Sequence, residues 1–259
     1  MRPPIDVSVS SDIQAVERVA RILDLFDHRS IELSAAEAAV RLGLKRTTVQ
    51  RYFSSMLGVG LLERGSAAGT YSPGRVLAQL GALAVGRRRV IDRALPHMRE
   101  LSVRTHLTSV LSLWGTAGPV VMHVEEDPAA SGVVTVRVGS RLSMLSAQAV
   151  VFLAFLGDES RGEAALAGLS ARSRAHARKL IKAARVSGVA TYISEETGVG
   201  GVAAPVFDTT GICATLAVLG TLVTTSSETR RGDQVAAAAA AITREMGGER
   251  FIETPERTG

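Results

Sequence analysis

The sequence predicts an α+β chain with a small, mainly helical first part and a larger second part built on an antiparallel sheet. Two short helical patterns meet at a glycine near the N-terminus, whereas apolar runs rich in β-branched residues, separated by Gly and Pro, fill the chain beyond residue 105. Charge follows the same division. Residues 1–89 carry 13 Lys or Arg against 8 Asp or Glu, and residues 90–259 carry 17 of each. The net charge of +5 therefore belongs to the first part, which favours a polyanion as its partner.

Residues 34–57 predict two short helices around a tight turn. Ser34 and Glu37 have the spacing of a capping box, in which each side chain pairs with a backbone N–H that the helix start leaves free. Gly43 is expected to end the first helix, because a residue without Cβ adopts the left-handed conformation at little cost. The first helix has an apolar face made of Ala35, Ala38, Ala39 and Leu42.

The second helix is predicted from about Lys45 to Met56. Four apolar residues at three- and four-residue spacing are expected in the core: Val49, Phe53, Met56 and Leu57. The remaining side chains suit DNA, since Arg and Gln pair with base edges and Lys and Thr hold phosphates. These candidate contacts are Lys45, Arg46, Thr47, Thr48, Gln50, Arg51 and Tyr52. An ordinary solvated helix face is the alternative that this pattern leaves open.

A β-hairpin is predicted directly after this helix. Its strands are Leu61–Arg64 and Thr70–Ser72, joined by a Gly/Ser/Ala turn. A hairpin in this place is the wing of a winged helix-turn-helix, and its tip can lie along the phosphate backbone. Ser34 and Arg64 complete the predicted set of DNA-contacting residues. The same fold also serves protein contacts, so a protein-binding winged helix is a second alternative.

Helices are also predicted on both sides of this domain. Before it, Ser11 and Gln14 form a possible capping box, and the buried stripe of a leading helix is expected at Ile13, Val16, Val19 or Ala20, Leu23 and Phe26. After it, residues 74–90 predict a linker helix whose apolar stripe is a candidate dimer contact. The triplet Arg87-Arg88-Arg89 is expected to be a solvated junction, with DNA contact as the alternative.

The second part predicts strands grouped with helices. Six strands are expected, over residues 105–115, 118–126, 132–139, 189–193, 200–207 and 212–220. Four helices are expected: the first follows the linker helix and is interrupted by Pro96, and the other three cover residues 143–157, 171–188 and 233–247. A concave face of such a sheet is a plausible ligand pocket. The domain boundaries that follow are a tail at 1–10, a DNA-binding domain at 11–73, a linker helix at 74–90, a ligand-binding domain at 91–248 and a tail at 249–259.

Composition argues against several other classes of protein. A single Cys excludes a disulfide framework and a Cys-based zinc site, and no window reaches the length of a membrane span. We therefore expect a cytoplasmic protein without a cofactor. The five histidines are scattered without metal-ligand spacing, and no nucleophile is accompanied by a base, so an enzyme is not predicted.

From about Ile13 to Met246 the chain resembles the IclR family of bacterial transcription factors. The segments that carry the resemblance, in matching order and spacing, are VERVARILDLF, AEAAVRLGLKRTTVQRYFSSMLGVGLLER, GTYSPG, PHMREL, VRVGSRLSMLSAQAVVFLAF and GVAAPVFDTTGICATLAVLG. The resemblance implies a winged helix-turn-helix that dimerises on operator DNA and a GAF-like effector-binding domain. It also implies a dimer-of-dimers tetramer and a small organic molecule as the signal.

The resemblance also implies where the effector binds. The corresponding positions here are Met144, Leu145, Gln148, Ala149, Ser194 or its neighbour Ile193, Gly201, Ala217 and Leu219. Because burying a small carboxylate among so few donors is costly, we expect an effector more apolar than glyoxylate or pyruvate. The polar handles that remain are Gln148, Ser194 and either His123 or Thr215. The alternative is a closed, ligand-blind domain that serves only oligomerisation.

Overall fold

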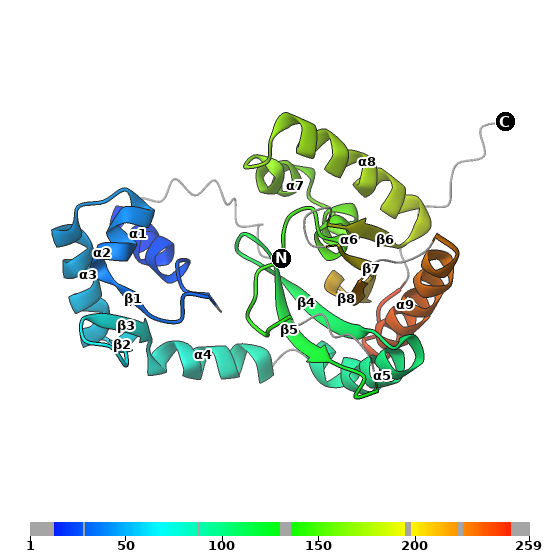
Figure 1. The fold of residues 1–259 in the computed structure, drawn as a ribbon, viewed down its shortest axis with the longest axis horizontal. Helices are drawn as coiled ribbons and strands as arrows, with labels where there is room; N and C mark the ends of the chain where they lie inside the picture. The colour runs from blue at the N-terminus through cyan, green and yellow to red at the C-terminus, as the bar shows by residue number, and fades with distance from the viewer. Residues whose placement is uncertain are drawn as a thin grey trace, which may run out of the picture. The chain divides into compact units, whose positions relative to one another are not determined.

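The structure, a computed structural model, divides into two compact units, Met1–Gly86 and Arg87–Gly259 (Figure 1). The residues that it describes are 13–27, 29–86, 89–129, 136–194, 198–221 and 225–249.

The first unit is helical with a small sheet. Its elements are α1 (Gln14–Leu23), β1 (Leu33–Ser34), α2 (Ala35–Leu42), α3 (Arg46–Gly58), β2 (Leu62–Arg64), β3 (Thr70–Pro73) and α4 (Arg75–Gly86). The predicted helix pair and hairpin are thus present. The short strand β1 was not predicted, and it pairs with β3 to give the order β1-β3-β2. Because β1 leads directly into α2, the sheet fixes the start of the helix pair.

One apolar core holds this unit together. Val49, Phe53 and Met56 of α3 are buried in it as predicted, and Leu57 is partly buried. The ring of Phe53 meets the ring of Tyr71 edge to face, with 4.8 Å between centroids. This contact joins α3 to strand β3, so the orientation of the helix and that of the hairpin depend on the same core.

The predicted buried stripe of α1 is wrong at two positions. Ile13 and Val16 are 62% and 64% exposed, whereas Ile22, which was not predicted, is completely buried. The reason is that α1 reaches the core only through its last turns, where Leu23 packs partly against it. Ile13 is the N-cap of the helix and makes no side-chain capping bond, and the predicted capping residue Ser11 lies outside the described residues.

Helix α4 follows β3 after a single residue, Gly74. The Gly74 N–H donates to the Leu61 carbonyl at 2.9 Å, and a Cβ at this position would lie 2.3 Å from the Gly60 oxygen. Only glycine allows this close approach, which holds the start of α4 against the hairpin. Farther along α4, Leu80 and Leu83 are 56% and 59% exposed. The apolar stripe predicted on the linker helix is therefore uncovered at these two residues, whereas Val76 and Leu77 at its start are half-buried.

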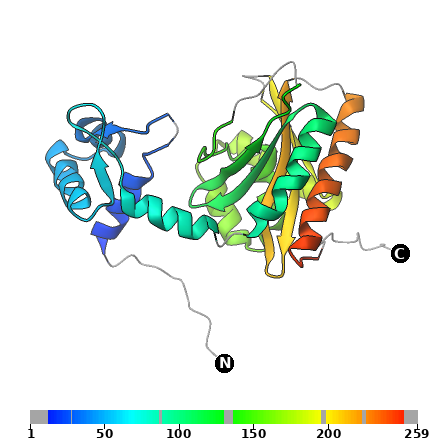
Figure 2. The ribbon, with the colours of Figure 1, turned by 90° about the horizontal axis from the view of Figure 1, so that it is seen from below.

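The second unit is a five-stranded antiparallel sheet in the order β5-β4-β8-β7-β6 (Figure 2). Its strands are β4 (Thr108–Gly115), β5 (Gly118–Glu125), β6 (Ala190–Ile193), β7 (Val199–Asp208) and β8 (Gly211–Thr221). Its helices are α5 (Arg89–Thr105), α6 (Ala147–Phe155), α7 (Glu159–Leu166), α8 (Ala171–Ser187) and α9 (Thr225–Glu245).

Helices cover both faces of this sheet. Helices α5 and α9 pack on the face that carries Val202, Ala204, Leu216 and Val218. Helices α6 and α8 pack on the opposite face, which carries Ala203 and Ala217 (Figure 1). This alternation is the period of two expected of strands buried on both sides, and it explains why the strand sequences are almost continuously apolar.

The structure of this unit differs from the prediction in two places. A strand was predicted over residues 132–139, but part of that segment lies outside the described residues, and Val136–Gly139 is not a strand. There the chain turns, with Gly139 at a φ of 84° and the Ser140 N–H bonded to the Arg137 carbonyl. Helix α7 was not predicted, because its eight residues have only a weak apolar periodicity.

Candidate functional site

A capping box fixes the start of α2, and a left-handed glycine forms the turn between α2 and α3. The Glu37 carboxylate accepts hydrogen bonds from the Ser34 N–H and from the Ser34 hydroxyl, both at 2.8 Å, and these two bonds lower the pKa of Glu37. The Glu37 N–H lies 3.2 Å from the Ser34 hydroxyl, to which it donates in turn. Gly43 is left-handed, with a φ of 65°, as predicted. Since Ser34 is engaged in the cap, its first role is to start α2, and its predicted contact with DNA has no separate support.

Helix α3 presents a polar face to solvent. Five of the predicted contacts are exposed along this helix and at its N-cap: Lys45, Arg46, Thr47, Gln50 and Arg51. Thr48 is half-buried. No hydrogen bond or ion pair is found for the side chains of Lys45, Arg46 or Arg51 with the described part of the chain. Three cations are thus free to meet an external anion.

Tyr52 departs from the prediction that it faces outward. Its side chain is half-buried and packs against the apolar core of the first unit. The physical reason is its large ring, which covers the core beside Phe53 more favourably than it hydrates. Tyr52 therefore supports α3 and is a poor candidate for reading bases.

A hydroxyl that was not predicted connects α3 to the wing. The Tyr71 oxygen accepts hydrogen bonds from the Gln50 amide at 2.9 Å and from Arg64 at 3.1 Å. Arg64 and Tyr71 are cross-strand partners, and the guanidinium carbon lies 5.0 Å from the centre of the ring. Gln50 thus uses one of its two amide N–H donors within the protein, so the other N–H and the amide oxygen can face DNA.

The tip of the wing is anchored by Glu32, another residue that was not predicted. Its carboxylate accepts hydrogen bonds from the Thr70 hydroxyl at 2.7 Å and from the backbone N–H of Ser66 at 2.8 Å. These bonds to Thr70 and then Ser66 lower the pKa of Glu32 to about 2. Gly65 is required beside them, since a Cβ there would lie 2.3 Å from the Thr70 oxygen and 2.4 Å from Glu32.

In the second unit, Gln148 is the most distinctive of the predicted effector residues. It belongs to α6, is 2% exposed, and donates from Nε2 to the Thr215 hydroxyl and carbonyl, both at 3.2 Å, and to the Val110 carbonyl at 3.3 Å. The structure therefore brings together two of the predicted polar handles, Gln148 and Thr215, on the face of the sheet that α6 covers.

The other predicted effector residues differ in their surroundings. Ala149 and Ala217 are completely buried, and Met144 and Leu145 are half-buried. Gly201 and Leu219 are cross-strand partners, and a Cβ on Gly201 would lie 2.7 Å from the Leu219 side chain. Leu219 therefore fills the space that the missing side chain of Gly201 leaves. Ser194 follows β6 and pairs through its N–H with the Val199 carbonyl.

His123 does not join this group, which corrects one prediction. It is the cross-strand partner of Leu111, whose side chain belongs to the core under α5 and α9. Its Nε2 lies 2.9 Å from Glu125, which also pairs with Arg99 of α5. Because side chains alternate along a strand, His123 is on the opposite face of the sheet from Gln148.

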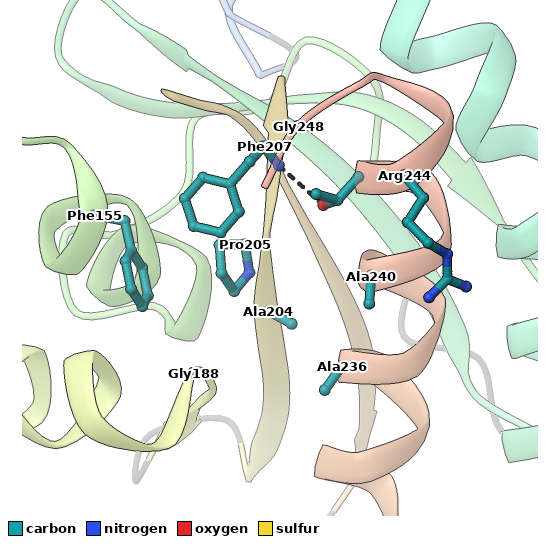
Figure 3. Close-up of a pocket in the computed structure, with 10 residues that line it drawn as sticks. Phe155, Gly188, Ala204, Pro205, Phe207, Ala236, Ala240, Arg244 and Gly248 are labelled. Carbon is teal, nitrogen blue, oxygen red and sulfur yellow. Dashed lines mark hydrogen bonds between the residues drawn. The ribbon is translucent and has the colours of Figure 1, made fainter. Parts of the chain in front are cut away.

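A hollow of the second unit lies elsewhere, at the edge of β7 (Figure 3). Strand β6 pairs with β7 only as far as Ala203, so the edge beyond it is uncovered, and Pro205 stands there, where a missing N–H is tolerated. The cavity measures about 190 Å³. It is lined by Phe155, Gly188, Ala204, Pro205, Phe207, Ala236, Ala240, Thr243, Arg244 and Gly248. None of the predicted effector residues lines it.

Two observations bear on other classes of site. Among the described residues, no three or more His, Cys, Asp or Glu side chains gather in a way that could hold a metal ion. Within the same part of the chain, no helix has both the length and the apolar character needed to cross a bilayer.

A winged helix with a free cationic face on α3, followed by a neutral sheet domain, is the arrangement expected of a DNA-binding transcriptional regulator. Residues 15–66 match the IclR helix-turn-helix domain, and residues 82–244 match the C-terminal domain of bacterial IclR transcriptional regulators. The chain belongs to the IclR family.

Individual proteins agree with this assignment. The chain is 30% identical to the HTH-type transcriptional regulator XynR of Escherichia coli K12 over 148 residues, which is 56% of this chain and 58% of XynR. The match therefore spans less than two thirds of that relative.

Solved structures share the fold over nearly the whole chain. An IclR regulator from Alicyclobacillus acidocaldarius is 25% identical, with a TM-score of 0.71 over 91% of this chain and 99% of its own. One from Silicibacter sp. TM1040 is 24% identical, with a TM-score of 0.80 over 91% and 97%. An IclR homologue from Microbacterium hydrocarbonoxydans, solved with 4-hydroxybenzoate, is 24% identical, with a TM-score of 0.68 over 90% and 98%.

Proposed function

We propose that this regulator binds a dyad-symmetric operator as a homodimer, with α3 of each copy in the major groove and the wing on the adjacent phosphates. The observation that carries the proposal is the set of three exposed cations without partners, Lys45, Arg46 and Arg51, in the first turns of the helix and at its N-cap. A recognition helix contacts base edges from this part of its length. The uncovered apolar face at Leu80 and Leu83 supports dimerisation through α4.

We propose further that a small organic molecule binds between α6 and the sheet and controls operator affinity in a dimer or a dimer of dimers. Half-sites must match the separation of the two recognition helices, so a change in that separation alters affinity. The apolar surroundings of Gln148 favour an effector more apolar than glyoxylate or pyruvate. The homologue solved with 4-hydroxybenzoate supports an aromatic compound as a candidate.

A ligand-blind second unit is the competing proposal. It is favoured by the tight packing at the predicted effector residues, where Leu219 fills the space beside Gly201. In this version the sheet domain serves only assembly. The two proposals differ in whether any small molecule changes the affinity of the protein for its operator.

The test begins with duplexes selected by the full-length protein from a random pool at low salt. Fluorescence anisotropy then measures their binding with and without aromatic alcohols and small hydrophilic acids. We expect salt-dependent binding that aromatic compounds change and glyoxylate and pyruvate do not. Binding that no compound changes supports the ligand-blind version, and failure to retain any duplex contradicts both proposals.

A further inference from the structure

Four buried side-chain polar atoms in the second unit have no hydrogen-bond partner among the residues that the structure describes, and two of them belong to residues that border Thr215. One is Oε1 of Gln148 on α6, and the other is the hydroxyl oxygen of Ser112 on β4. The residues are 2% and 0% exposed. Such atoms cost free energy unless something satisfies them, so each calls for an explanation.

The orientation of the Gln148 amide is determined by its neighbours. Its nitrogen faces two backbone carbonyls, those of Val110 and Thr215, and a carbonyl can only accept. Exchanging the nitrogen and oxygen of the amide would bring Oε1 against both of these oxygens. The unpaired atom is therefore the oxygen, and it can only accept a hydrogen bond.

Ser112 lies beside the same residue that Gln148 contacts. Ser112 and Thr215 are cross-strand partners, and directly opposed side chains of antiparallel strands are close neighbours on one face. Gln148 bonds to the Thr215 hydroxyl from α6, which covers that face. Both unpaired atoms thus border Thr215. The Gln148 oxygen there can only accept a hydrogen bond, whereas the Ser112 hydroxyl can donate one and accept one.

The side chains around this pair are apolar and partly aromatic. Trp114, two residues beyond Ser112 on the same strand, meets Phe152 of α6 with 5.4 Å between ring centroids. Met144 and Leu145 pack near Trp114 and are half-buried. Methionine adapts its shape readily, so this side of the site can admit a ring more easily than the alanine-rich side can.

We propose that Ser112 and Gln148 recognise a neutral hydroxyl group on an apolar, ring-containing effector. This inference rests on the proposed effector site and names the chemistry that the site reads. The hydroxyl donates to Gln148 Oε1 and accepts from the Ser112 hydroxyl, so one group satisfies both atoms. A carboxylate would oppose Oε1 with a second acceptor, and an ammonium would bury a charge without a counterion.

The experiment uses the full-length protein and three probes that share one ring: phenol, toluene and benzoate. Calorimetry measures the affinity of each for the wild-type protein and for Ser112→Ala, with Ser109→Ala as the matched control. Ser109 is buried on the same strand, but its hydroxyl donates to the Met98 carbonyl beneath α5, on the other face of the sheet. Neither variant alters a residue that is proposed to contact DNA.

We expect phenol to bind more tightly than toluene and benzoate, and Ser112→Ala to reduce the preference for phenol over toluene about tenfold. The control should leave this preference unchanged. Equal binding of phenol and toluene, tighter binding of benzoate, an unchanged preference in Ser112→Ala, or no binding of any probe would each overturn the inference. The last result would mean that the pair holds only a buried water.

Operator binding, measured on the same samples, distinguishes a failure of this inference from a failure of the proposed function. If the protein retains its operator and responds to benzoate, the regulator stands and the hydroxyl inference fails. If the protein retains no operator, the DNA-binding proposal fails, whatever the probes do.

Discussion

The two units use polar side chains in opposite ways. In the first unit the cations of α3 face solvent, and the polar contacts that shape the site, those of Glu32 and the Tyr71 hydroxyl, are only partly buried, and the partners of the Tyr71 hydroxyl are exposed side chains. In the second unit Gln148, Thr215 and Ser112 are buried in an apolar layer. A surface site can change without cost to the core, whereas a buried polar group ties ligand binding to stability. Each prediction below tests this difference.

The largest effect is expected from removing one buried ring in each unit. Phe53→Ala and Phe152→Ala each delete a ring that is at most 1% exposed and should cost about 3–5 kcal/mol of unfolding free energy in the unit concerned. We expect Phe53→Ala to abolish operator binding and to leave the melting of the second unit unchanged. We expect Phe152→Ala to lower the melting temperature of the second unit and to leave operator binding unchanged. Calorimetry with operator anisotropy measures both. If either variant destabilises both units equally, the units are not independent.

The next effect concerns the exposed face of α3. Arg46→Ala and Arg51→Ala should each weaken operator binding by about 1–3 kcal/mol if they contact bases, with no change in melting temperature. Arg172→Ala provides the matched control, because Arg172 is an exposed arginine of α8 in the second unit. Anisotropy titrations measure the affinities. Normal operator binding by both α3 variants would mean that another surface reads the DNA.

A smaller effect is expected from the anchor of the wing. Glu32→Gln replaces the carboxylate that holds the tip, so operator affinity should fall, but less than in the arginine variants. Glu63→Gln, on strand β2 of the same wing, is the control.

Acid provides an independent test of this anchor. The folded pKa of Glu32, about 2, lies below its ordinary value of 4.5, so its stabilisation is complete above pH 4.5 and is lost as the pH falls through about 2. The stability advantage of the wild-type protein over Glu32→Gln should therefore shrink across this window in denaturant titrations. A constant difference would show that the carboxylate does not stabilise the wing.

The smallest effect is expected at the hydroxyl that joins α3 to the wing. Tyr71→Phe keeps the ring against Phe53 and removes only the oxygen that accepts from Gln50 and Arg64. Both donors lie at the surface and can turn to water, so the cost should be about 0.5–1.5 kcal/mol. Chemical denaturation measures it. A loss as large as that of Phe53→Ala would place the hydroxyl within the core of the unit.

Local patterns explain why the helix pair could be predicted from the sequence. The cap at Ser34 and the left-handed Gly43 depend on contacts within a few residues, and the core positions of α3 follow from helical spacing alone; all of them are observed. The exposure of Ile13 and Val16 was missed, because periodicity identifies an apolar face without identifying what covers it. The strand expected at 132–139 failed where Gly139 turns the chain.

Contacts between distant residues explain what could not be predicted. Glu32 reaches the wing tip 34 residues away, and nothing local to it indicates this role. Gln148 meets Thr215 across 67 residues, and only the strand register shows that His123 is on the opposite face. For Tyr71 the sequence offered one weak indication of its role, a polar aromatic residue in a wing strand. Its hydrogen-bond partners could not be predicted, because they depend on the pairing with Arg64.

Protection of guanine N7 from methylation tests the central claim most directly, because this atom lies in the major groove. On a selected operator, we predict protected guanines in two symmetric half-sites separated by whole helical turns, with protection lost at defined positions in Arg46→Ala or Arg51→Ala. Protection that is the same in the wild-type protein and in both variants, or no protection in the major groove, would contradict the account.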